Sequence, residues 1–381
     1  MEVDSKLNKL VSSGASISKD KIEILKKFIE DSNNKNIINV LKDLMDELDS
    51  ISYKFLESNV IYDISSTIAT NNINLNVYGG KNITYKTEFD IASITKLFTL
   101  ILVFNYIDNN ILQLNDKVCK LDSKFPYLDY TIFDLIQMSG AIKTNKRIDE
   151  ASNYNDALDI LYNVYPVNYN KGVNNYTDIG FMVLSKLLED ITNKSFKDIM
   201  INFYNNYGIE INQMKDIIGN GYNDLLPHDP KARIMGFIGS AGVFINSINM
   251  DKFANEVISC DIISKDNLYK LSNKLFDMNH PNKGYGGIYV KHPLGIKKTS
   301  TPLEYTNFAF SHQGYTGSCL IIDPILKIHN NILVNAIMDN KKKDINFYKE
   351  FNIYHEKLVL LTLKTYLTDI EDINIKIKRK I

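Results

Sequence analysis

Two β-branched stretches near opposite ends of the chain enclose a long block with helical periodicity, and this arrangement most restricts the possible folds. Near the N-terminus, "VIYDISSTIAT" and "NINLNVYGG" are bounded by Asn-Asn and Gly-Gly, as in two antiparallel strands. Strand patterns return in "GYGGIYV" (284–290), "NFAFSHQGYTGSCLIID" (307–323) and "NNILVNAIMD" (330–339). Helical patterns dominate from residue 93 to residue 211. The pattern predicts an α+β fold (an α/β sandwich) whose antiparallel sheet of about five strands, flanked by helices, is formed by both ends of the chain.

The same pattern predicts the domain organisation. Residues 1–50 are polar and helical, with apolar positions on one face of "KDKIEILKKFIEDS" and "NIINVLKDLMDELDSI", and form an N-terminal extension. Residues 51–370 form the main domain, into which a mostly helical subdomain (about 115–245) is inserted. Residues 371–381 form a frayed tail. The sequence leaves open whether the extension packs on the main domain.

Composition excludes several classes of function. A formal net charge of −1 gives no electrostatic case for binding nucleic acid or an anionic membrane. The longest apolar run, residues 97–104, is too short to span a bilayer. Three widely spaced cysteines without a Cys-x-x-Cys pair favour free thiols in a reducing compartment over disulfides or a zinc site. The N-terminal text lacks the features of a signal peptide, so a cytoplasmic protein is expected.

A serine and a lysine three residues apart begin the apolar segment "DIASITKLFTLILVF" (90–104). Ser93 is predicted at or just inside a helix N-terminus, where Lys96 shares its helix face and reaches its hydroxyl. The N–H groups and positive field of a helix N-terminus favour an oxyanion, and burial lowers a lysine pKa toward that of a general base. A capping serine with a snorkelling lysine fits this segment equally well. Two further Ser-x-x-Lys matches, at Ser16 and Ser18, lie in polar text and are interpreted as chance.

The wider text "TEFDIASITKLFTLILVFNYIDNNILQLNDKV" resembles the serine β-lactamase and penicillin-binding protein superfamily. The nearest likeness is to the branch of class C β-lactamases, D-alanyl-D-alanine carboxypeptidases and esterases. That branch has S-x-T-K on an apolar helix followed by "G-x-L-x-L-D-D-x-V", which residues 110–118 resemble. "TIFDLIQMSGAI" (131–142) resembles a further segment of the branch, one residue short and without its histidine.

A second motif of the superfamily is Tyr-x-Asn followed by a glycine, an aromatic residue and an apolar helix. "NNYTDIGFMVLSKLLEDIT" (174–192) is similar at Tyr176, Gly180 and Phe181. A phenol near an ammonium relays a proton, so the resemblance implies that Tyr176 serves Ser93 together with Lys96. The alternative is a tyrosine at a helix entry, with Thr177 or Asp178 as the N-cap.

The third motif is Lys- or His-x-Gly on an edge strand, which "FAFSHQGYTGSCLIIDP" (308–324) resembles nearly residue for residue. The resemblance implies that His312 faces the leaving group or substrate carboxylate, and that Gly314 lets a substrate backbone approach. It also implies an oxyanion hole made by the N–H groups of Ser93 and Tyr315. For His312 the alternative is a sheet histidine in a polar network. In "LLPHDPKARIMGFIGSAGVFINSINMDKFA" (225–254), His228 either lines the site or belongs to an Asp-Pro turn.

The chain departs from the superfamily pattern at Asp178, where asparagine is usual. A carboxylate only accepts hydrogen bonds, and beside Lys96 it would raise the pKa of that lysine, which favours the tyrosine as proton carrier. Its negative charge disfavours carboxylate-bearing β-lactams, and histidine instead of lysine at 312 weakens the fixed positive charge. Weak or absent β-lactamase activity is therefore expected.

The resemblance implies a serine hydrolase that acts through a covalent acyl-enzyme on a small ester, amide or D-amino-acid peptide. One alternative is an acyltransferase or peptide macrocyclase, in which a non-water acceptor attacks the same acyl-serine. Another is a catalytically idle member that binds a ligand or partner. No metal or cofactor is implied, the expected partner is a small-molecule or peptide acyl substrate, and the oligomeric state stays open.

Overall fold

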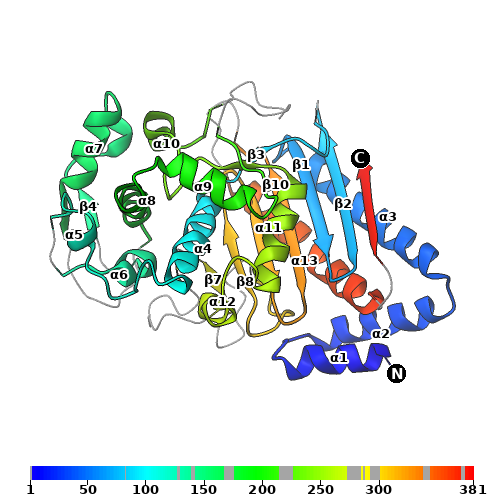
Figure 1. The fold of residues 1–381 in the computed structure, drawn as a ribbon. Coiled ribbons are helices and arrows are strands. Elements are labelled where there is room, and N and C mark those ends of the chain that lie inside the picture. The colour runs from blue at the N-terminus through cyan, green and yellow to red at the C-terminus, as the bar shows by residue number, and fades with distance from the viewer. Residues whose placement is uncertain are drawn as a thin grey trace.

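A computed structural model gives the fold and describes residues 2–81, 83–126, 129–138, 142–166, 176–213, 226–272, 285, 288–291, 301–337, 344–369 and 374–381. Among the described residues, a seven-stranded sheet with the strand order β11-β2-β1-β10-β9-β8-β7 forms the centre of the molecule (Figure 1). Its strands are Asp63–Ala69 (β1), Ile73–Gly80 (β2), Tyr289–Val290 (β7), Phe310–Gln313 (β8), Cys319–Asp323 (β9), Ile328–Val334 (β10) and Ile375–Lys380 (β11). Parts of the predicted segments 131–142, 174–192, 284–290 and 330–339 lie outside the described residues.

Both ends of the chain build this sheet, which confirms the predicted α+β architecture. The N-terminal hairpin β1–β2 pairs through β1 with the C-terminal strand β10, and Ile64 lies opposite Val334. All neighbouring pairs from β2 to β7 are antiparallel. The alternation of side chains along each strand gives the sheet two covered faces, each with its own apolar core.

The prediction of a frayed tail is wrong, because the tail forms a strand. This strand is one of those by which the sheet exceeds the expected number of about five. Residues 375–380 form β11, which pairs in parallel with β2 at the sheet edge. The sequence "IKIKRK" alternates with period two, so Ile375 and Ile377 pack against the core while the intervening lysines are exposed. Arg379 forms ion pairs with Asp46 and Asp49 of the neighbouring helix. Lysines on an edge strand disfavour pairing with another chain, which reconciles a charged tail with a strand.

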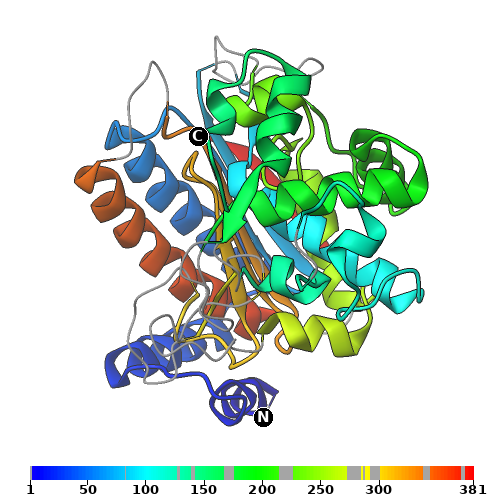
Figure 2. The same ribbon diagram turned by 90° about the vertical axis from the view of Figure 1, so that its left-hand side faces the viewer.

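Four helices come from the two chain ends; the two longer ones cover one face of the sheet, and the two shorter ones pack against the C-terminal helix (Figure 2). They are Glu2–Ser12 (α1), Lys19–Asn33 (α2), Ile37–Glu57 (α3) and Ile345–Thr368 (α13). Phe55 of α3 stacks on Tyr354 of α13 with ring centroids 4.8 Å apart. Ser18 caps α2 by accepting a hydrogen bond from the Lys21 N–H, which explains that Ser-x-x-Lys match structurally. α3 runs through residue 50 and packs on the sheet, so its secondary structure is continuous across the predicted boundary. The division into extension and main domain stays a prediction.

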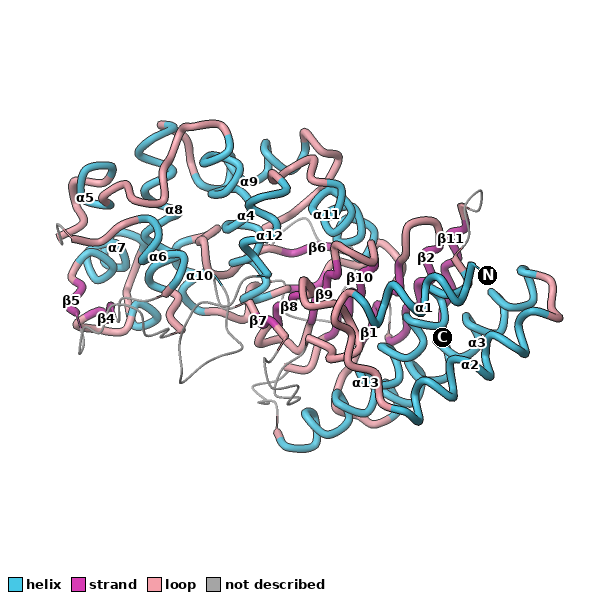
Figure 3. Tube along the Cα trace, turned by 90° about the horizontal axis from the view of Figure 1, so that it is seen from below, coloured by secondary structure: helices cyan, strands magenta, loops and turns pink. Residues whose placement is uncertain are grey.

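The other face is covered by the helices Thr95–Asp108 (α4) and Ser247–Ser259 (α11) and by the mostly helical block beside them (Figures 1 and 3). The side chains of α4 from Thr95 to Phe104 are all buried, which explains a helix that is apolar on every side. Phe98 stacks on Phe253 of α11 with centroids 3.9 Å apart. The further helices are Val118–Leu121 (α5), Ile132–Gln137 (α6), Tyr154–Tyr162 (α7), Ile179–Thr192 (α8), Phe196–Asn205 (α9), Pro230–Met235 (α10) and Lys265–Ser272 (α12).

Short elements complete the block. Phe89–Asp90 (β3) pairs with Phe244–Ile245 (β6), and Ile142–Thr144 (β4) pairs with Val164–Pro166 (β5). Two 3₁₀ turns, Ala92–Ile94 (η1) and Ile148–Glu150 (η2), precede α4 and α7. None of the helices in the described part of the chain is long and apolar enough to cross a membrane.

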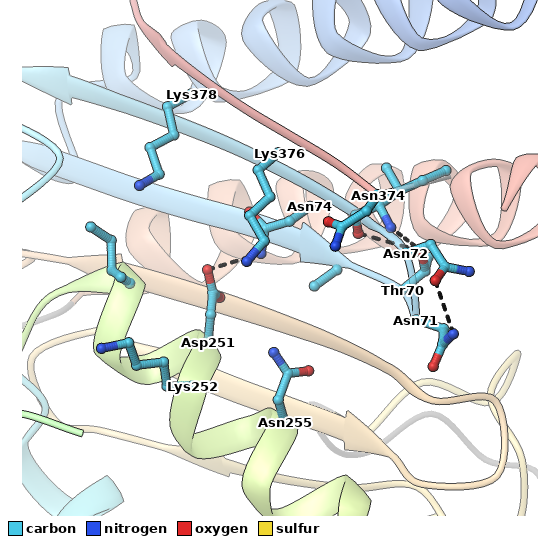
Figure 4. A pocket seen from close by; sticks show the side chains of 13 residues that line it. Thr70, Asn71, Asn72, Asn74, Asp251, Lys252, Asn255, Asn374, Lys376 and Lys378 are labelled. Carbon is cyan, nitrogen blue, oxygen red and sulfur yellow. Dashed lines mark hydrogen bonds between the residues drawn. The ribbon is translucent and has the colours of Figure 1, made fainter. Parts of the chain in front are cut away.

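A polar crevice of about 240 Å³ lies between the β1–β2 turn, α11 and β11 (Figure 4). Lys252, Lys376 and Lys378 line it together with several asparagines. The carboxylate of Asp251, which also lines the crevice, accepts a hydrogen bond from the Asn74 amide at 3.0 Å. None of the predicted site residues lines this crevice, so it is separate from the candidate active site.

Candidate active site

Ser93 lies in a tight turn between β3 and α4. Asp90 ends β3, and its Oδ1 accepts a hydrogen bond of 2.7 Å from the Ala92 N–H. Ala92 has φ = 49°, a left-handed conformation that costs a non-glycine residue about 1–2 kcal/mol. Ser93 follows in η1, immediately before α4, and remains partly exposed while Ala92 and Ile94 are buried. The turn therefore presents the serine at a helix N-terminus, where the sequence placed it.

Lys96 is fully buried and its ammonium reaches three groups from different parts of the chain. Nζ donates to Ser93 Oγ at 3.1 Å and to the Ser240 carbonyl oxygen at 3.1 Å. It also lies 2.7 Å from Asp178 Oδ1. The Lys96 ammonium thus connects the serine with the loop before β6 and with the segment that leads into α8.

The pKa of Lys96 is raised above its ordinary value. The sequence supported two opposite expectations for this pKa, a decrease by burial and an increase by Asp178. Burial alone lowers the pKa of this lysine, but the charges and hydrogen bonds of Tyr176 and Asp178 outweigh it. The expectation that desolvation lowers the pKa of Lys96 to that of a general base is therefore wrong. The predicted increase of this pKa by Asp178 has the correct sign. Lys96 is an ammonium at neutral pH.

Tyr176 and Asp178 approach Lys96 from the segment that leads into α8. The Tyr176 ring centroid lies 4.9 Å from Lys96 Nζ, and the two side chains also share a hydrogen bond. The Tyr176 side chain is 48% exposed, so it forms part of the rim. Asp178 is the N-cap residue of α8, but its side chain makes no capping hydrogen bond; the Ile179 N–H instead donates to Thr177 Oγ1 at 3.2 Å.

Lys231 is a site residue that the sequence reasoning missed. Its Nζ lies 3.1 Å from Asp178 Oδ2 and 3.0 Å from Asp229 Oδ1. Burial raises the pKa of Asp178, but Lys96 and Lys231 outweigh burial and lower this pKa to about 2. Asp178 is thus ionised between two lysines, and its charge is balanced inside the site. Nothing local in "HDPKA" announces this pairing, because the partner lies on another helix.

The strand β8 and the loop after it lie against the turn that carries Ser93. His312 is buried on β8, with Nδ1 3.0 Å from the Gln313 carbonyl oxygen. A Cβ at Gly314 would lie 2.5 Å from the Ile91 carbonyl oxygen, so glycine is required there by the chain's own backbone. The predicted reason for Gly314, close approach of a substrate, remains a prediction.

Tyr315 is half-exposed and stacks on His228, with ring centroids 5.5 Å apart. His228 in turn contacts Asp90, the residue that shapes the Ser93 turn, at 2.9 Å between Nδ1 and Oδ2. The sequence left His228 open between a residue of the site and a residue of a turn. The structure brings it to the site, together with Asp90, which the sequence reasoning did not consider.

Within the described ranges, no group of three or more His, Cys, Asp or Glu side chains is placed to hold a metal ion. The groups described above are a serine hydroxyl, two ammonium groups, three carboxylates, two phenols and two imidazoles. Such a set suits proton transfer and covalent acyl chemistry.

Comparison with known proteins identifies the architecture. Similar solved structures include EstCE1, "a hydrolase with promiscuous acyltransferase activity", at 13% identity and a TM-score of 0.65; 82% of this chain and 98% of that chain are covered. A class C beta-lactamase aligns at 13% identity and a TM-score of 0.62, covering 83% and 96%. The penicillin binding protein from Bacillus halodurans aligns at 16% identity and a TM-score of 0.60, covering 74% and 94%. No curated protein matches the chain significantly.

A family model matches part of the chain. Residues 68–202, which include Ser93, Lys96 and Tyr176, match the model described as Beta-lactamase. Together with the similar solved structures, this partial match supports the resemblance to the serine β-lactamase and penicillin-binding protein superfamily. The resemblance on which the sequence reasoning rested is confirmed at this level. This likeness supports a serine hydrolase in general terms.

Proposed function

We propose that this protein is a serine hydrolase that forms a covalent acyl-enzyme at Ser93 with a small ester, amide or D-amino-acid peptide. The observation that carries the proposal is the hydrogen bond of 3.1 Å from Lys96 Nζ to Ser93 Oγ, made by an ammonium that also contacts Tyr176 and Asp178. A buried ammonium lowers the cost of generating negative charge on the serine and on the phenol.

In the proposed acylation step, Ser93 Oγ attacks the carbonyl carbon of the substrate. Because Lys96 is already protonated, Tyr176 in its phenolate form takes the hydroxyl proton, and the ammonium stabilises the phenolate. The backbone N–H groups of Ser93 and Tyr315 are proposed to hold the oxyanion. The tetrahedral intermediate then expels the leaving group, which takes the proton from Tyr176 and leaves an acyl-Ser93 ester.

Deacylation reverses these roles. Water adds to the acyl carbonyl and gives its proton to Tyr176, and Ser93 Oγ leaves and is reprotonated, so that acid and free enzyme result. His312 is proposed to face the leaving group or the substrate. We expect weak β-lactamase turnover. Because Lys231 balances Asp178, this expectation now rests mainly on histidine at position 312.

An acyltransferase or macrocyclase is the second candidate, in which an amine or hydroxyl replaces water in the last step. Two half-exposed tyrosines, Tyr176 and Tyr315, form part of the rim and offer aromatic surface to an acceptor. A p-nitrophenyl ester assayed with and without an amine acceptor separates the two functions. Product dominated by the amide supports the transferase.

The three cysteines are free thiols, which supports a reducing compartment such as the cytoplasm.

The primary test is intact-mass analysis after treatment with a fluorophosphonate. We expect one covalent adduct on the wild-type protein, none on Ser93→Ala, and much slower labelling of Lys96→Met. Ser18→Ala is the matched control, because it removes the serine of another Ser-x-x-Lys match and should label like the wild type. A folded wild-type protein that takes no adduct would refute the proposal and favour an idle, ligand-binding member.

A further inference from the structure

Three segments that are far apart in the sequence meet at Asp90, two at its carboxylate and one at its backbone carbonyl. Oδ1 accepts from the Ala92 N–H, within the turn that carries Ser93. Oδ2 accepts from the His228 N–H at 2.8 Å and lies 2.9 Å from His228 Nδ1. The Asp90 carbonyl oxygen accepts from Thr316 Oγ1 at 2.7 Å, in the loop after β8. One buried residue thus fixes the position of the serine turn relative to both other segments.

The His228 ring closes this arrangement on its other side. It stacks on the Tyr315 ring with centroids 5.5 Å apart and an angle of 24° between the planes. Tyr315 and Ser93 are the residues whose N–H groups are proposed to form the oxyanion hole. The imidazole therefore bridges the two segments whose relative position determines the shape of that hole.

We propose that His228 and Asp90 form a positioning pair that holds the Ser93 turn and the Tyr315 loop in the geometry needed for acyl transfer. This inference rests on the proposed function, because it concerns the same site. His228 acts through Asp90 and Tyr315 rather than on the substrate, so it is a positioning residue. The pair lies outside the serine, lysine and tyrosine that carry the proposed chemistry.

The charges around His228 predict how the pair responds to pH. Burial lowers the pKa of His228, but Asp90 outweighs it, and Asp229 adds to the increase while Lys231 opposes it. Burial raises the pKa of Asp90, but His228 and the N–H donors bring it below its ordinary value. The ion pair therefore persists to a higher pH than the ordinary pKa of histidine would allow. Because the folded pKa of His228 is raised, the ion pair is complete below pH 6.5 and is lost as pH rises through the raised value.

The test is the rate of fluorophosphonate labelling at Ser93 between pH 5 and pH 10, on the full-length protein. For wild type we expect the rate to decrease as pH rises through the raised pKa of His228. His228→Asn keeps a donor toward Asp90 but carries no charge, so this decrease should disappear and the rate at neutral pH should fall about 10-fold. In His228→Ala the labelling rate should fall about 100-fold. The decrease should appear in the rate constant for covalent bond formation and not in the reversible binding of the probe.

His329 and Asp251 provide a matched control, because they form another histidine–aspartate pair with 3.2 Å between Nε2 and Oδ1. His329→Asn should keep the wild-type labelling rate and pH profile. The inference is overturned if His228→Asn keeps the wild-type pH profile, or if a folded His228→Ala labels at the wild-type rate. An unlabelled wild type overturns it together with the proposed function, whereas a labelled wild type with insensitive variants overturns the positioning pair alone.

Discussion

Replacing Asp178 by asparagine removes the carboxylate in contact with Lys96 while nearly preserving the shape of the side chain. Lys96 is fully buried, and the charges are 2.7 Å apart. An adjacent opposite charge shifts a pKa by about 1–3 units, or about 1.4–4 kcal/mol. Because Asp178 is 28% exposed and shared with Lys231, we expect the lower half of this range, about 1–2 units. The variant should therefore lose about 1.4–2.7 kcal/mol of unfolding free energy at pH 7.

The pH dependence follows from the sign of each shift. The pKa of Asp178 is lowered from 3.8 to about 2, so its stabilising contribution is present above pH 3.8 and is lost as pH falls toward 2. Asp178→Asn should abolish this part of the acid destabilisation. Because Asp178 helps to raise the pKa of Lys96, losing the carboxylate should lower that pKa and bring the decrease of Ser93 labelling at high pH to a lower pH.

Urea unfolding at pH 7 and at pH 3, and fluorophosphonate labelling from pH 6 to pH 11, measure the two effects. Glu189→Gln is the matched control, because Glu189 pairs with the buried Lys186 at 2.9 Å on the same helix and is 24% exposed. It should lower stability without moving the labelling profile. Unchanged stability together with an unmoved alkaline limb in Asp178→Asn would refute the reasoning.

Three further changes test other parts of the structure. Lys231→Met should raise the pKa of Asp178, because Lys231 is one of the two cations that lower it; the loss of stability between pH 7 and pH 3 in urea unfolding should then be smaller, and an unchanged pH profile would contradict this. Gly314→Ala should lower the unfolding free energy by about 1–3 kcal/mol and slow labelling, because the added Cβ meets the Ile91 carbonyl oxygen; unchanged melting would contradict the clash. Deleting residues 374–381 should lower the melting temperature by exposing the β2 edge, yet leave the labelling rate at the wild-type value.

The fold class and the chain order of the site were accessible from the sequence because they depend on local patterns. Period-two runs at both chain ends predicted the strands, and the apolar run after Ser93 predicted an apolar helix, which the structure shows to be buried on every side. The tail failed for the same reason that these patterns succeeded. Its alternation was present, but its lysines were interpreted as a solvated end, and only the open edge of β2 makes such a segment a strand.

The pairing of groups within the site was decided by the tertiary structure. Ser93 and Lys96 are one helical turn apart, so their contact follows from helix geometry. The contacts of Asp178 with Lys231 and of Asp90 with His228 join segments that no local period connects. The direction of the Lys96 pKa depends on the balance between burial and these distant charges. The sequence by itself determined where helices and strands form and which chemical groups they carry. Only the folded chain determined which charges face one another, because Coulomb interactions depend on distances in space.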